Sequence, residues 1–268
     1  TFDLGFFDMK SPLRYPGGKS LAAKIIMKYF PKIDEMCSPF MGGGSIEIAC
    51  AEKGIRVHAY DIFEPLNCFW EYLLKDADAL YAEVEKLHPM TRDQFYEYQK
   101  TNASMPDSIE RAAMFYALNR SSFSGSTLSG GWSPQHPRFN KSNMETLRKL
   151  KLPNLTVEHL DCLEAIKKHK DLFLYLDPPY LLEQQNQNKL YGVQGSTHQG
   201  FNHQGLFDLL KDRDNWIMSY NNGAEIMEMY KDFKIIEPQW AYGMSKDKKA
   251  KEALIFSKNL DPDAFLPF

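Results

Sequence analysis

A strand, a glycine-rich loop, a helix and a second strand follow one another near the start of the chain. They occupy residues 35–40, 41–45, 46–54 and 55–60, and Gly54 is the expected cap of the helix. Asp61 ends the second strand, 17 residues beyond Gly44, where an acid can take both hydroxyls of a ribose. The dinucleotide pattern G-x-G-x-x-G is not met, because Glu47 stands at the third glycine position. The order of elements therefore predicts a nucleoside-binding βαβ unit, and with it an open α/β sheet.

The tetrapeptide Asp177-Pro178-Pro179-Tyr180 directly follows the apolar run 172–176, which has the composition of a buried parallel strand. The end of such a strand is where open α/β sheets bind ligands. A carboxylate can accept a hydrogen bond from an exocyclic amino group, proline holds neighbouring carbonyls rigidly, and an aromatic ring can stack on a base outside its helix. Asp-Pro-Pro is also an ordinary loop string. Because a nucleoside-binding unit accompanies it, the tetrapeptide favours a site that methylates an amino nitrogen of a nucleobase.

A second glycine-rich segment, Tyr15-Pro16-Gly17-Gly18-Lys19, precedes a helical pattern over residues 21–30. Backbone N–H groups at the start of a helix can bind an anion. A P-loop is excluded by spacing, since G-x-x-x-x-G-K-[ST] requires a glycine where Leu13 stands.

Residues 67–152 differ in character from the segments on either side. Amphipathic helices are predicted at 68–74, 92–98 and 109–119, followed by a loop of small residues at 121–134. Residues 134–151 carry five basic side chains and one acid, which suits a solvated helix face or a surface that contacts phosphates. The adjacent small-residue loop favours the phosphate-contacting surface. We therefore expect a catalytic domain of residues 1–66 and 153–268, with an inserted helical subdomain of residues 67–152.

The sheet is expected to continue after the insert. Strands are predicted at 155–160 and 216–220, helices at 205–211 and 224–230, and a closing antiparallel pair of strands at 233–238 and 252–257. The polar segment 181–205 is expected to form a lid, and the basic segment 242–251 a second phosphate contact.

Charge and cysteine content narrow the class of protein. A net charge of −3 excludes a basic field over the whole molecule, so nucleic acid would have to bind a local patch. The four cysteines form no C-x-x-C pair and the histidines show no ligand spacing, so neither disulfides nor a metal site are expected. Apolar runs fall short of about 20 residues, and the first residues lack a signal-peptide pattern. These features predict an intracellular protein, in the cytoplasm or nucleoid of a bacterium or of a virus-infected host, with no membrane partner.

With these motifs in this order, the chain resembles the alpha group of DNA adenine-N6 methyltransferases, the DNA adenine methyltransferase family. The resemblance rests on Pro-Gly-Gly-Lys at 16–19, Phe40-x-Gly42-x-Gly44, a recognition insert and Asp-Pro-Pro-Tyr at 177–180. It implies an α/β fold: a Rossmann-like S-adenosylmethionine-dependent methyltransferase sheet with an inserted, mainly helical target-recognition subdomain. The implied activity is sequence-specific transfer of a methyl group from S-adenosylmethionine to adenine N6 in duplex DNA, by direct displacement on a flipped-out base.

The resemblance also implies residue roles. The methionine part of the cofactor would be held by Tyr15, Pro16, Gly17, Gly18, Lys19, Phe40, Gly42 and Gly44, its ribose by Asp61, and its adenine amino group by Asp161, with Cys162 in the same site. Asp177 and the carbonyl of Pro178 would orient the target amino group, with Pro179 between them and Tyr180, which would stack on the flipped base. The expected DNA contacts are Arg120, Ser124, Ser126, Arg138, Asn140 and Lys141. Residues 126–132 replace the Arg-Tyr-Asn run of related adenine enzymes, so the resemblance implies no particular recognition sequence.

Other interpretations of the same residues stay open at this point. A methyltransferase acting on cytosine N4, on RNA or on a protein glutamine would use similar chemistry, although Asp177 favours adenine. A catalytically silent DNA-binding protein of the same fold is the alternative from another class. The expected partners are double-stranded DNA and, in a restriction-modification system, a cognate restriction endonuclease. The chain is expected to be a monomer or weak dimer that releases S-adenosylhomocysteine and needs no metal.

Overall fold

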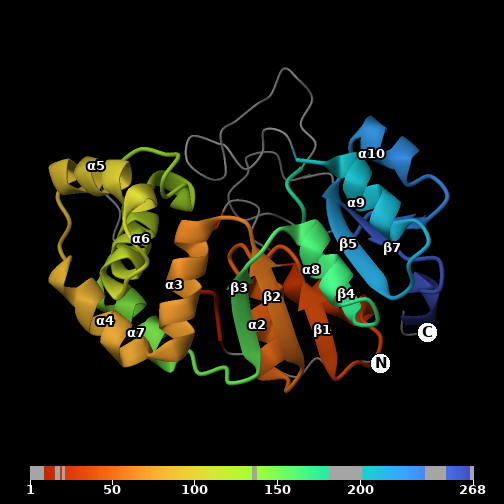
Figure 1. The fold of residues 1–268 in the computed structure, drawn as a ribbon, viewed down its shortest axis with the longest axis horizontal. Helices are drawn as coiled ribbons and strands as arrows, with labels where there is room; N and C mark the ends of the chain where they lie inside the picture. Colours follow the sequence, from red (N-terminus) through yellow and green to blue (C-terminus); the bar gives the residue numbers. More distant parts are fainter. Residues whose placement is uncertain are drawn as a thin grey trace.

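The computed structural model describes residues 9–15, 19, 22–134, 138–180, 201–238 and 252–265. These residues build a seven-stranded sheet in the order β3-β2-β1-β4-β5-β7-β6 (Figure 1). The strands are β1 (Glu35–Ser38), β2 (Arg56–Asp61), β3 (Leu155–His159), β4 (Phe173–Leu176), β5 (Trp216–Asn221), β6 (Lys234–Ile236) and β7 (Glu252–Phe256). From β3 to β5 all neighbours are parallel, and β7 is antiparallel to both β5 and β6.

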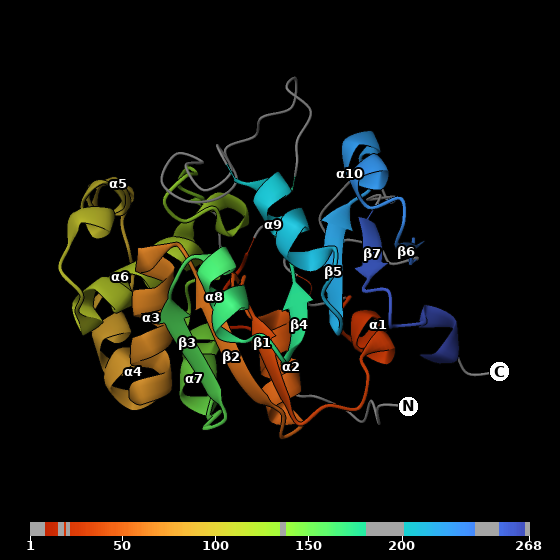
Figure 2. The same ribbon diagram turned by 45° about the vertical axis from the view of Figure 1, so that its right-hand side comes forward.

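Side chains of the central strands alternate between two buried faces of the sheet. Phe173 and Ile217 belong to the cluster on one face, and Leu174 and Met218 to the cluster on the other. The first face is covered by α1 (Ala23–Ile26), a 3₁₀ turn (Met27–Tyr29) and α2 (Ser45–Glu52), and the second by α8 (Cys162–Lys168), α9 (His203–Leu210) and α10 (Ala224–Met229), as Figure 2 shows. Burial of each such side chain stabilises the fold by about 1.5–3 kcal/mol. Because both faces are covered, these strands appear in the sequence as continuous apolar runs.

A helical lobe interrupts the chain between β2 and β3 and lies beside the β3 edge of the sheet (Figure 1, Figure 2). It consists of α3 (Glu64–Lys75), α4 (Ala77–Lys86), α5 (Arg92–Thr101), α6 (Ile109–Ser121) and α7 (Lys141–Lys149), with 3₁₀ turns at Asn102–Ser104 and Phe123–Gly125. The helix α3 packs against both β3 and α6 and so joins the lobe to the sheet. The predicted boundary at residues 66 and 67 lies inside this joining helix.

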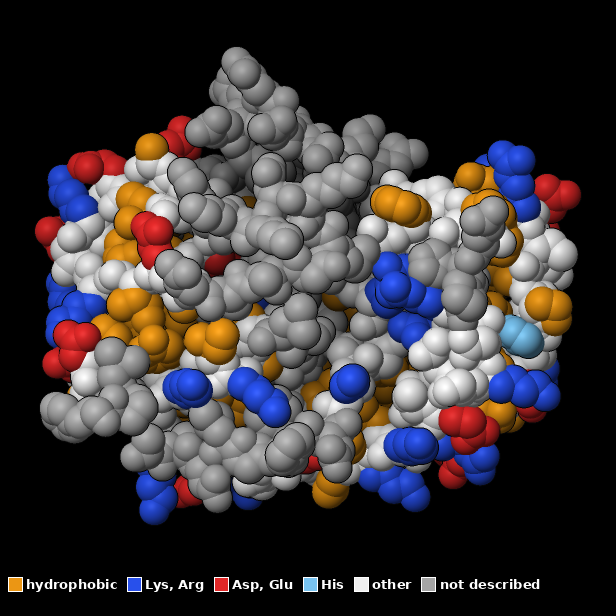
Figure 3. All heavy atoms as spheres, turned by 180° about the vertical axis from the view of Figure 1, so that it is seen from behind, with side chains coloured by type: hydrophobic (Ala, Val, Ile, Leu, Met, Phe, Trp, Pro, Cys, Tyr) orange, Lys and Arg blue, Asp and Glu red, His pale blue; other side chains and the backbone are white. Residues whose placement is uncertain are grey.

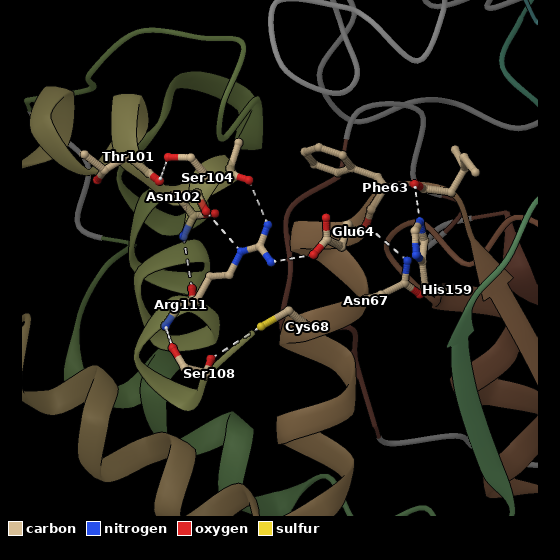
Figure 4. A network of polar contacts seen from close by, with 12 residues as sticks. Phe63, Glu64, Asn67, Cys68, Thr101, Asn102, Ser104, Ser108, Arg111 and His159 are labelled. Atoms are coloured by element: carbon tan, nitrogen blue, oxygen red, sulfur yellow. Dashed lines mark hydrogen bonds and ion pairs between the residues drawn. The ribbon is translucent and has the colours of Figure 1, made fainter. Parts of the chain in front are cut away.

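Arg111 is the central polar group of the lobe (Figure 4). Its side chain is fully buried; Nη1 donates to Glu64 Oε1 at 2.9 Å, and Nε and Nη2 donate to the carbonyls of Asn102 and Ala103, each at 3.0 Å. The amide of Asn102 donates in return to the Arg111 carbonyl at 3.0 Å. A buried carbonyl left without a donor costs about 1–3 kcal/mol. Arg111 therefore ties α3, the 3₁₀ turn after α5, and α6 into one unit.

The predicted α/β fold class is confirmed, and several local predictions are corrected. The first strand ends at Ser38 and not at residue 40, and the helix predicted over 21–30 continues from α1 into a 3₁₀ turn. Gly54 follows α2 with a φ of +85°, as a helix-ending glycine does. The loop predicted over 181–205 is wrong at its end, because α9 begins at His203, capped by Asn202. Residues 181–200 of that loop and the basic segment 242–251 lie outside the described residues. None of the described helices is long and apolar enough to cross a membrane.

Candidate active site

The candidate site is a cavity of about 370 Å³ at the carboxyl ends of β1 and β4. These strands are neighbours in the sheet, but the chain passes through β2 and β3 between them. Their loops diverge at this point, and open α/β sheets bind ligands in such a crevice. Of the predicted catalytic and cofactor-binding residues, the wall includes Tyr15, Lys19, Phe40, Gly42, Gly44, Asp61, Asp161, Cys162, Asp177, Pro178, Pro179 and Tyr180. The other predicted members, Pro16, Gly17 and Gly18, lie outside the described residues.

The glycine loop that follows β1 is packed too closely to carry side chains. Gly44 has a φ of +70°, and a Cβ there would lie 2.6 Å from Met41 Cε. A Cβ on Gly43 would lie 2.7 Å from Tyr15 Cβ. The bare backbone of this loop therefore forms part of the cavity wall, with Tyr15 packed against it.

Asp61 holds this loop in place. Its Oδ2 accepts a hydrogen bond from Gly42 N at 2.9 Å, and its Oδ1 accepts one from Phe63 N at 3.0 Å. Burial raises the pKa of the Asp61 carboxyl, and the two backbone donors oppose that rise. Each carboxylate oxygen has a second lone pair, so Asp61 can position the loop and still accept from a ligand hydroxyl.

Asp161 and Cys162 stand at the start of α8. Asp161 caps the helix by accepting from Leu163 N at 2.9 Å, and its side chain is exposed at the cavity. Burial raises the pKa of the Cys162 thiol to about 12. At neutral pH Cys162 is therefore a neutral thiol, which suits a wall position and does not suit a nucleophile.

Asp177 belongs to a cluster of four polar side chains, which we call the lysine cluster: Lys19, Asp177, Tyr180 and Glu252. Lys19 Nζ donates to Asp177 Oδ1 at 2.9 Å and Oδ2 at 3.0 Å, and to the Tyr180 hydroxyl at 3.0 Å. Glu252, at the start of β7, lies 3.0 Å from the same nitrogen and accepts from the Tyr180 hydroxyl at 2.5 Å. Lys19 and Glu252 are 3% and 4% exposed, so their charges are shielded from solvent.

Burial governs the protonation of this cluster. It raises the pKa of Asp177 to about 6; Lys19 opposes the rise and Glu252 adds to it. Burial alone would lower the pKa of Lys19, but Asp177, Tyr180 and Glu252 raise it well above its ordinary value. Near neutral pH the lysine is charged and Asp177 is largely ionised, so this carboxylate is a hydrogen-bond acceptor.

The ring and backbone of the Asp-Pro-Pro-Tyr segment are held from β5. The Tyr220 hydroxyl donates to the Pro179 carbonyl at 3.4 Å, and its ring centroid is 6.1 Å from that of Tyr180. Tyr180 lines the cavity, and its hydroxyl is fixed by the lysine cluster. An aromatic ring restrained in this way can stack on a base at low entropic cost.

Two buried acidic residues of the site carry no predicted role: Glu47 lines the cavity, and Glu252 contacts it through the lysine cluster. Glu252 is in contact with Lys19, and Glu47, on α2, is 3% exposed and accepts from Ser38 Oγ at 2.5 Å. Glu47 stood out in the sequence only as a departure from the dinucleotide pattern. Glu252 stood at the start of a predicted strand with no further signal. Neither local pattern indicates which way these side chains point.

The predicted DNA contacts all lie in or beside the helical lobe, but in different environments. Lys141, at the start of α7, and Arg138 are exposed, whereas Arg120 is 8% exposed and its Nε donates to the Arg138 carbonyl at 3.1 Å. Asn140 caps α7 by accepting from Asn143 N, and Ser126 Oγ donates to the Phe123 carbonyl at 2.7 Å. Ser124 is half-buried with a φ of +55°. Structural contacts therefore occupy Arg120, Asn140 and Ser126. Solvent-exposed positive charge is offered by Lys141 and Arg138.

Arg14 was not predicted and joins this basic surface. Burial, together with the neighbouring guanidinium groups of Arg138 and Arg120, lowers the pKa of Arg14 to about 10. Three mutually repelling guanidinium groups favour an anion such as a phosphate nearby. Seen from behind, Lys and Arg side chains gather on the helical lobe near the sheet (Figure 3).

The loop after α6 touches the segment that leads to Lys19. Asn119 Oδ1 accepts from Arg14 N at 2.9 Å, and its Nδ2 donates to the Arg14 carbonyl at 2.7 Å. Gly125 closes over the same carbonyl with a φ of +74°. These contacts connect the helical lobe to Tyr15, and so to the cavity wall.

Comparison with known families shows to which class of protein the chain belongs. The family model of the D12 class N6 adenine-specific DNA methyltransferases matches residues 15–244, most of the chain. The chain belongs to this family. No curated protein matches it significantly.

As a D12 methyltransferase the protein transfers a methyl group to adenine N6 in DNA, and its family uses S-adenosylmethionine. The residues present fit that cofactor. A cavity of about 370 Å³ falls within the usual range for small-molecule sites, the glycine loop permits close backbone approach, and acidic side chains suit a sulfonium cation. Among the described residues, no group of three or more His, Cys, Asp or Glu side chains is placed to hold a metal.

Proposed function

We propose that this D12 methyltransferase acts on an adenine rotated out of the duplex into the cavity, with the amino group held by Asp177. The observation that carries the proposal is the position of the Asp177 carboxylate. It lies at the end of β4, in the wall shared with the glycine loop, and the side chain is 24% exposed. An adenine amino group cannot reach such a recess while stacked in a helix, so the base must leave the stack.

Asp177 and Pro178 would act on the reacting nitrogen through hydrogen bonds. The lone pair of adenine N6 is delocalised into the ring, which makes the nitrogen a poor nucleophile. Donation of its two N–H groups to the Asp177 carboxylate and the Pro178 carbonyl would favour a more tetrahedral nitrogen as positive charge develops. Bound S-adenosylmethionine supplies an electrophilic methyl group, and the fixed position of the amino group provides the proximity.

The lysine cluster would keep Asp177 available. In the structure Lys19 donates to both oxygens of Asp177, the acceptors that the adenine amino group needs. Glu252 offers Lys19 a second carboxylate at 3.0 Å. When adenine engages Asp177, Lys19 can stay neutralised by Glu252 without leaving its buried position. This exchange avoids an unpaired buried charge.

The cofactor would lie along the same wall. Asp61, at the end of β2, would accept from the ribose hydroxyls, and Asp161, at the start of α8, from the adenine amino group. Tyr15, Phe40 and the glycine loop would enclose the methionine part. All of these side chains line the cavity, which supports the assignment.

The helical lobe would be the target-recognition subdomain, with residues 67–152 as its proposed extent. Arg138 and Lys141 offer exposed positive charge, and Phe123 presents an apolar ring that is 68% exposed. Basic groups can contact phosphates, and an exposed ring can occupy the gap that a flipped base leaves.

The proposal is tested by measuring the transfer of tritium from labelled S-adenosylmethionine into unmethylated duplex DNA and then analysing the nucleosides. Fluorescence of 2-aminopurine placed at the mapped target adenine should rise on binding by the wild type. Asp177→Asn should retain that rise and lose transfer. A variant that methylates as fast as the wild type would overturn the role of Asp177.

A further inference from the structure

Glu47 is a buried carboxylate in the cavity wall that the reaction as described does not use. It stands in the first turn of α2, just after Gly44, and is 3% exposed. Its carboxylate accepts from Ser38 Oγ, at 2.5 Å from Oε1, and from its own backbone N–H. Burying a carboxylate is costly unless its charge is met by hydrogen bonds or a cation. One hydroxyl and one backbone N–H are a weak complement for a full negative charge.

The surroundings of Glu47 hold it poised between its two protonation states. Burial raises the pKa of Glu47 to about 7, with Asp177 adding to the rise and Ser38 and Lys19 opposing it. The titratable groups that face it are Lys19 from the N-terminal segment, Tyr175 and Asp177 from β4 and its end, and Cys50 from α2. Of these only Lys19 is cationic, and it is already bonded to Asp177 and Glu252. Glu47 is thus an acid whose charge an incoming cation would stabilise.

The cavity wall as a whole favours a cation. Glu47, Asp61, Asp161 and Asp177 all line it, against the single lysine Lys19 among its described wall residues. S-adenosylmethionine carries an ammonium and a sulfonium against one carboxylate, so it enters as a net cation. Its product has lost the sulfonium charge and is neutral overall.

We propose that Glu47, oriented by Ser38, binds the α-ammonium group of the methionine part of S-adenosylmethionine. The assignment rests on the proposed function, because it requires that the cofactor occupy this cavity. The sulfonium methyl must face the amino group held at Asp177, whereas the amino-acid end belongs with the glycine loop and the first turn of α2. Glu47 is the carboxylate of that turn.

This contact links cofactor binding to a proton. In the empty cavity Glu47 is about half protonated near pH 7, since its pKa is about 7. An ammonium favours the ionised form, so binding releases a proton and the affinity for S-adenosylmethionine rises as pH rises through 7. The pKa of Asp177 is about 6, close to that of Glu47, so the pH dependence is assigned to Glu47 by its loss in Glu47→Gln.

The test is calorimetric affinity for three ligands at pH 6.5, 7.5 and 8.5: S-adenosylmethionine, S-adenosylhomocysteine and methylthioadenosine, which lacks the amino-acid part. Glu47→Gln keeps the shape of the side chain and a partner for the Ser38 hydroxyl. This variant should lower the affinity for S-adenosylmethionine and S-adenosylhomocysteine about 10- to 100-fold. It should leave the affinity for methylthioadenosine unchanged and remove the pH dependence of binding. Glu52→Gln, on the same helix but outside the cavity wall, is the matched control and should resemble the wild type.

Each other outcome has a definite meaning. If Glu47→Gln binds each of the three ligands as tightly as the wild type does, Glu47 serves only to hold α2 against β1, and the proposal fails. Loss confined to S-adenosylmethionine would place Glu47 at the sulfonium and overturn the ammonium assignment. A folded wild type that binds none of the ligands would refute the cofactor site itself.

Ser38→Ala provides a second variant. It should move the pH dependence of binding to higher pH, because the Ser38 hydrogen bond lowers the pKa of Glu47. A pH dependence equal to that of the wild type would contradict the proposal.

Discussion

Lys19 Nζ lies 2.9 Å from Asp177 Oδ1, so in this structure the carboxylate assigned to the target base is already bonded to a buried cation. Adenine must therefore share or displace this lysine before its amino group can be held. Glu252, 3.0 Å from the same nitrogen, makes that exchange possible without leaving a buried charge unpaired.

Glu252→Gln should move the acid limb of the pH–rate profile. Glu252 raises the pKa of Asp177, which is about 6, so its removal lowers that pKa and keeps Asp177 ionised in more acidic solution. The limb should shift to lower pH by about one unit, and the plateau rate should fall because Lys19 is bound more firmly by Asp177. Single-turnover methyl transfer between pH 5 and 8 measures both. If the variant is slower but the acid limb stays at the same pH, Glu252 has only a structural role. Glu228, exposed on α10, provides the control variant Glu228→Gln.

Asp177→Asn should reduce methyl transfer by about 10²–10³-fold, because a carboxamide cannot supply the negative charge that stabilises the developing cation. Affinity for S-adenosylmethionine should change little, since Asp61 and the glycine loop remain. Asp161→Ala should show the reverse pattern, with weaker cofactor binding and nearly unchanged transfer at saturation. Equal loss of binding and transfer in Asp177→Asn would contradict the division of roles.

Local sequence was sufficient to locate much of the site. Asp61, Asp161 and Asp177 each stand at or just after the end of a strand, and the ends of neighbouring parallel strands meet at one edge of a sheet. The glycine loop was visible for the same reason, since it joins a strand directly to a helix. These assignments need only the order of elements.

Contacts between distant segments could not be predicted in this way. Glu252 reaches Tyr180 from 72 residues further along the chain, and Asn119 holds Arg14 across 105 residues. Their meeting depends on the register of β7 and on the packing of α6, which no local pattern specifies. The helix α4 was also not predicted; its cap, Asp76, lies directly after α3.

Lys141→Ala should weaken DNA binding and reduce the slope of log affinity against log salt by about one. Lys141 is exposed at the start of α7, three residues after the exposed Arg138. Lys231→Ala is the control, because that lysine is paired with Glu228 on α10, outside the helical lobe. A salt slope equal to that of the wild type would identify Lys141 as part of a merely solvated helix face.

Phe123→Ala should lower DNA affinity by about tenfold, as expected when one aromatic stacking contact worth about 1–3 kcal/mol is lost. The ring is 68% exposed, so its removal should hardly alter the melting temperature. Filter binding with duplex DNA and a thermal melt separate the two effects. A fall in melting temperature without a change in DNA affinity would show that the ring packs on the protein.

Gly125→Ala tests whether the helical lobe is coupled to the cofactor site. A Cβ at this position would lie 2.2 Å from the Arg14 carbonyl, and the residue has a φ of +74°. Gly54 has a similar φ of +85° but nothing within 4 Å of its Cβ position, so Gly54→Ala carries the backbone strain without the clash. The control should lose about 1–2 kcal/mol of unfolding free energy and bind both ligands normally. Gly125→Ala should lose more unfolding free energy than this control. It should also bind both S-adenosylmethionine and DNA more weakly, because displacing Arg14 moves the adjoining Tyr15 in the cavity wall. Weakened DNA binding with unchanged cofactor affinity would show that the two sites are independent.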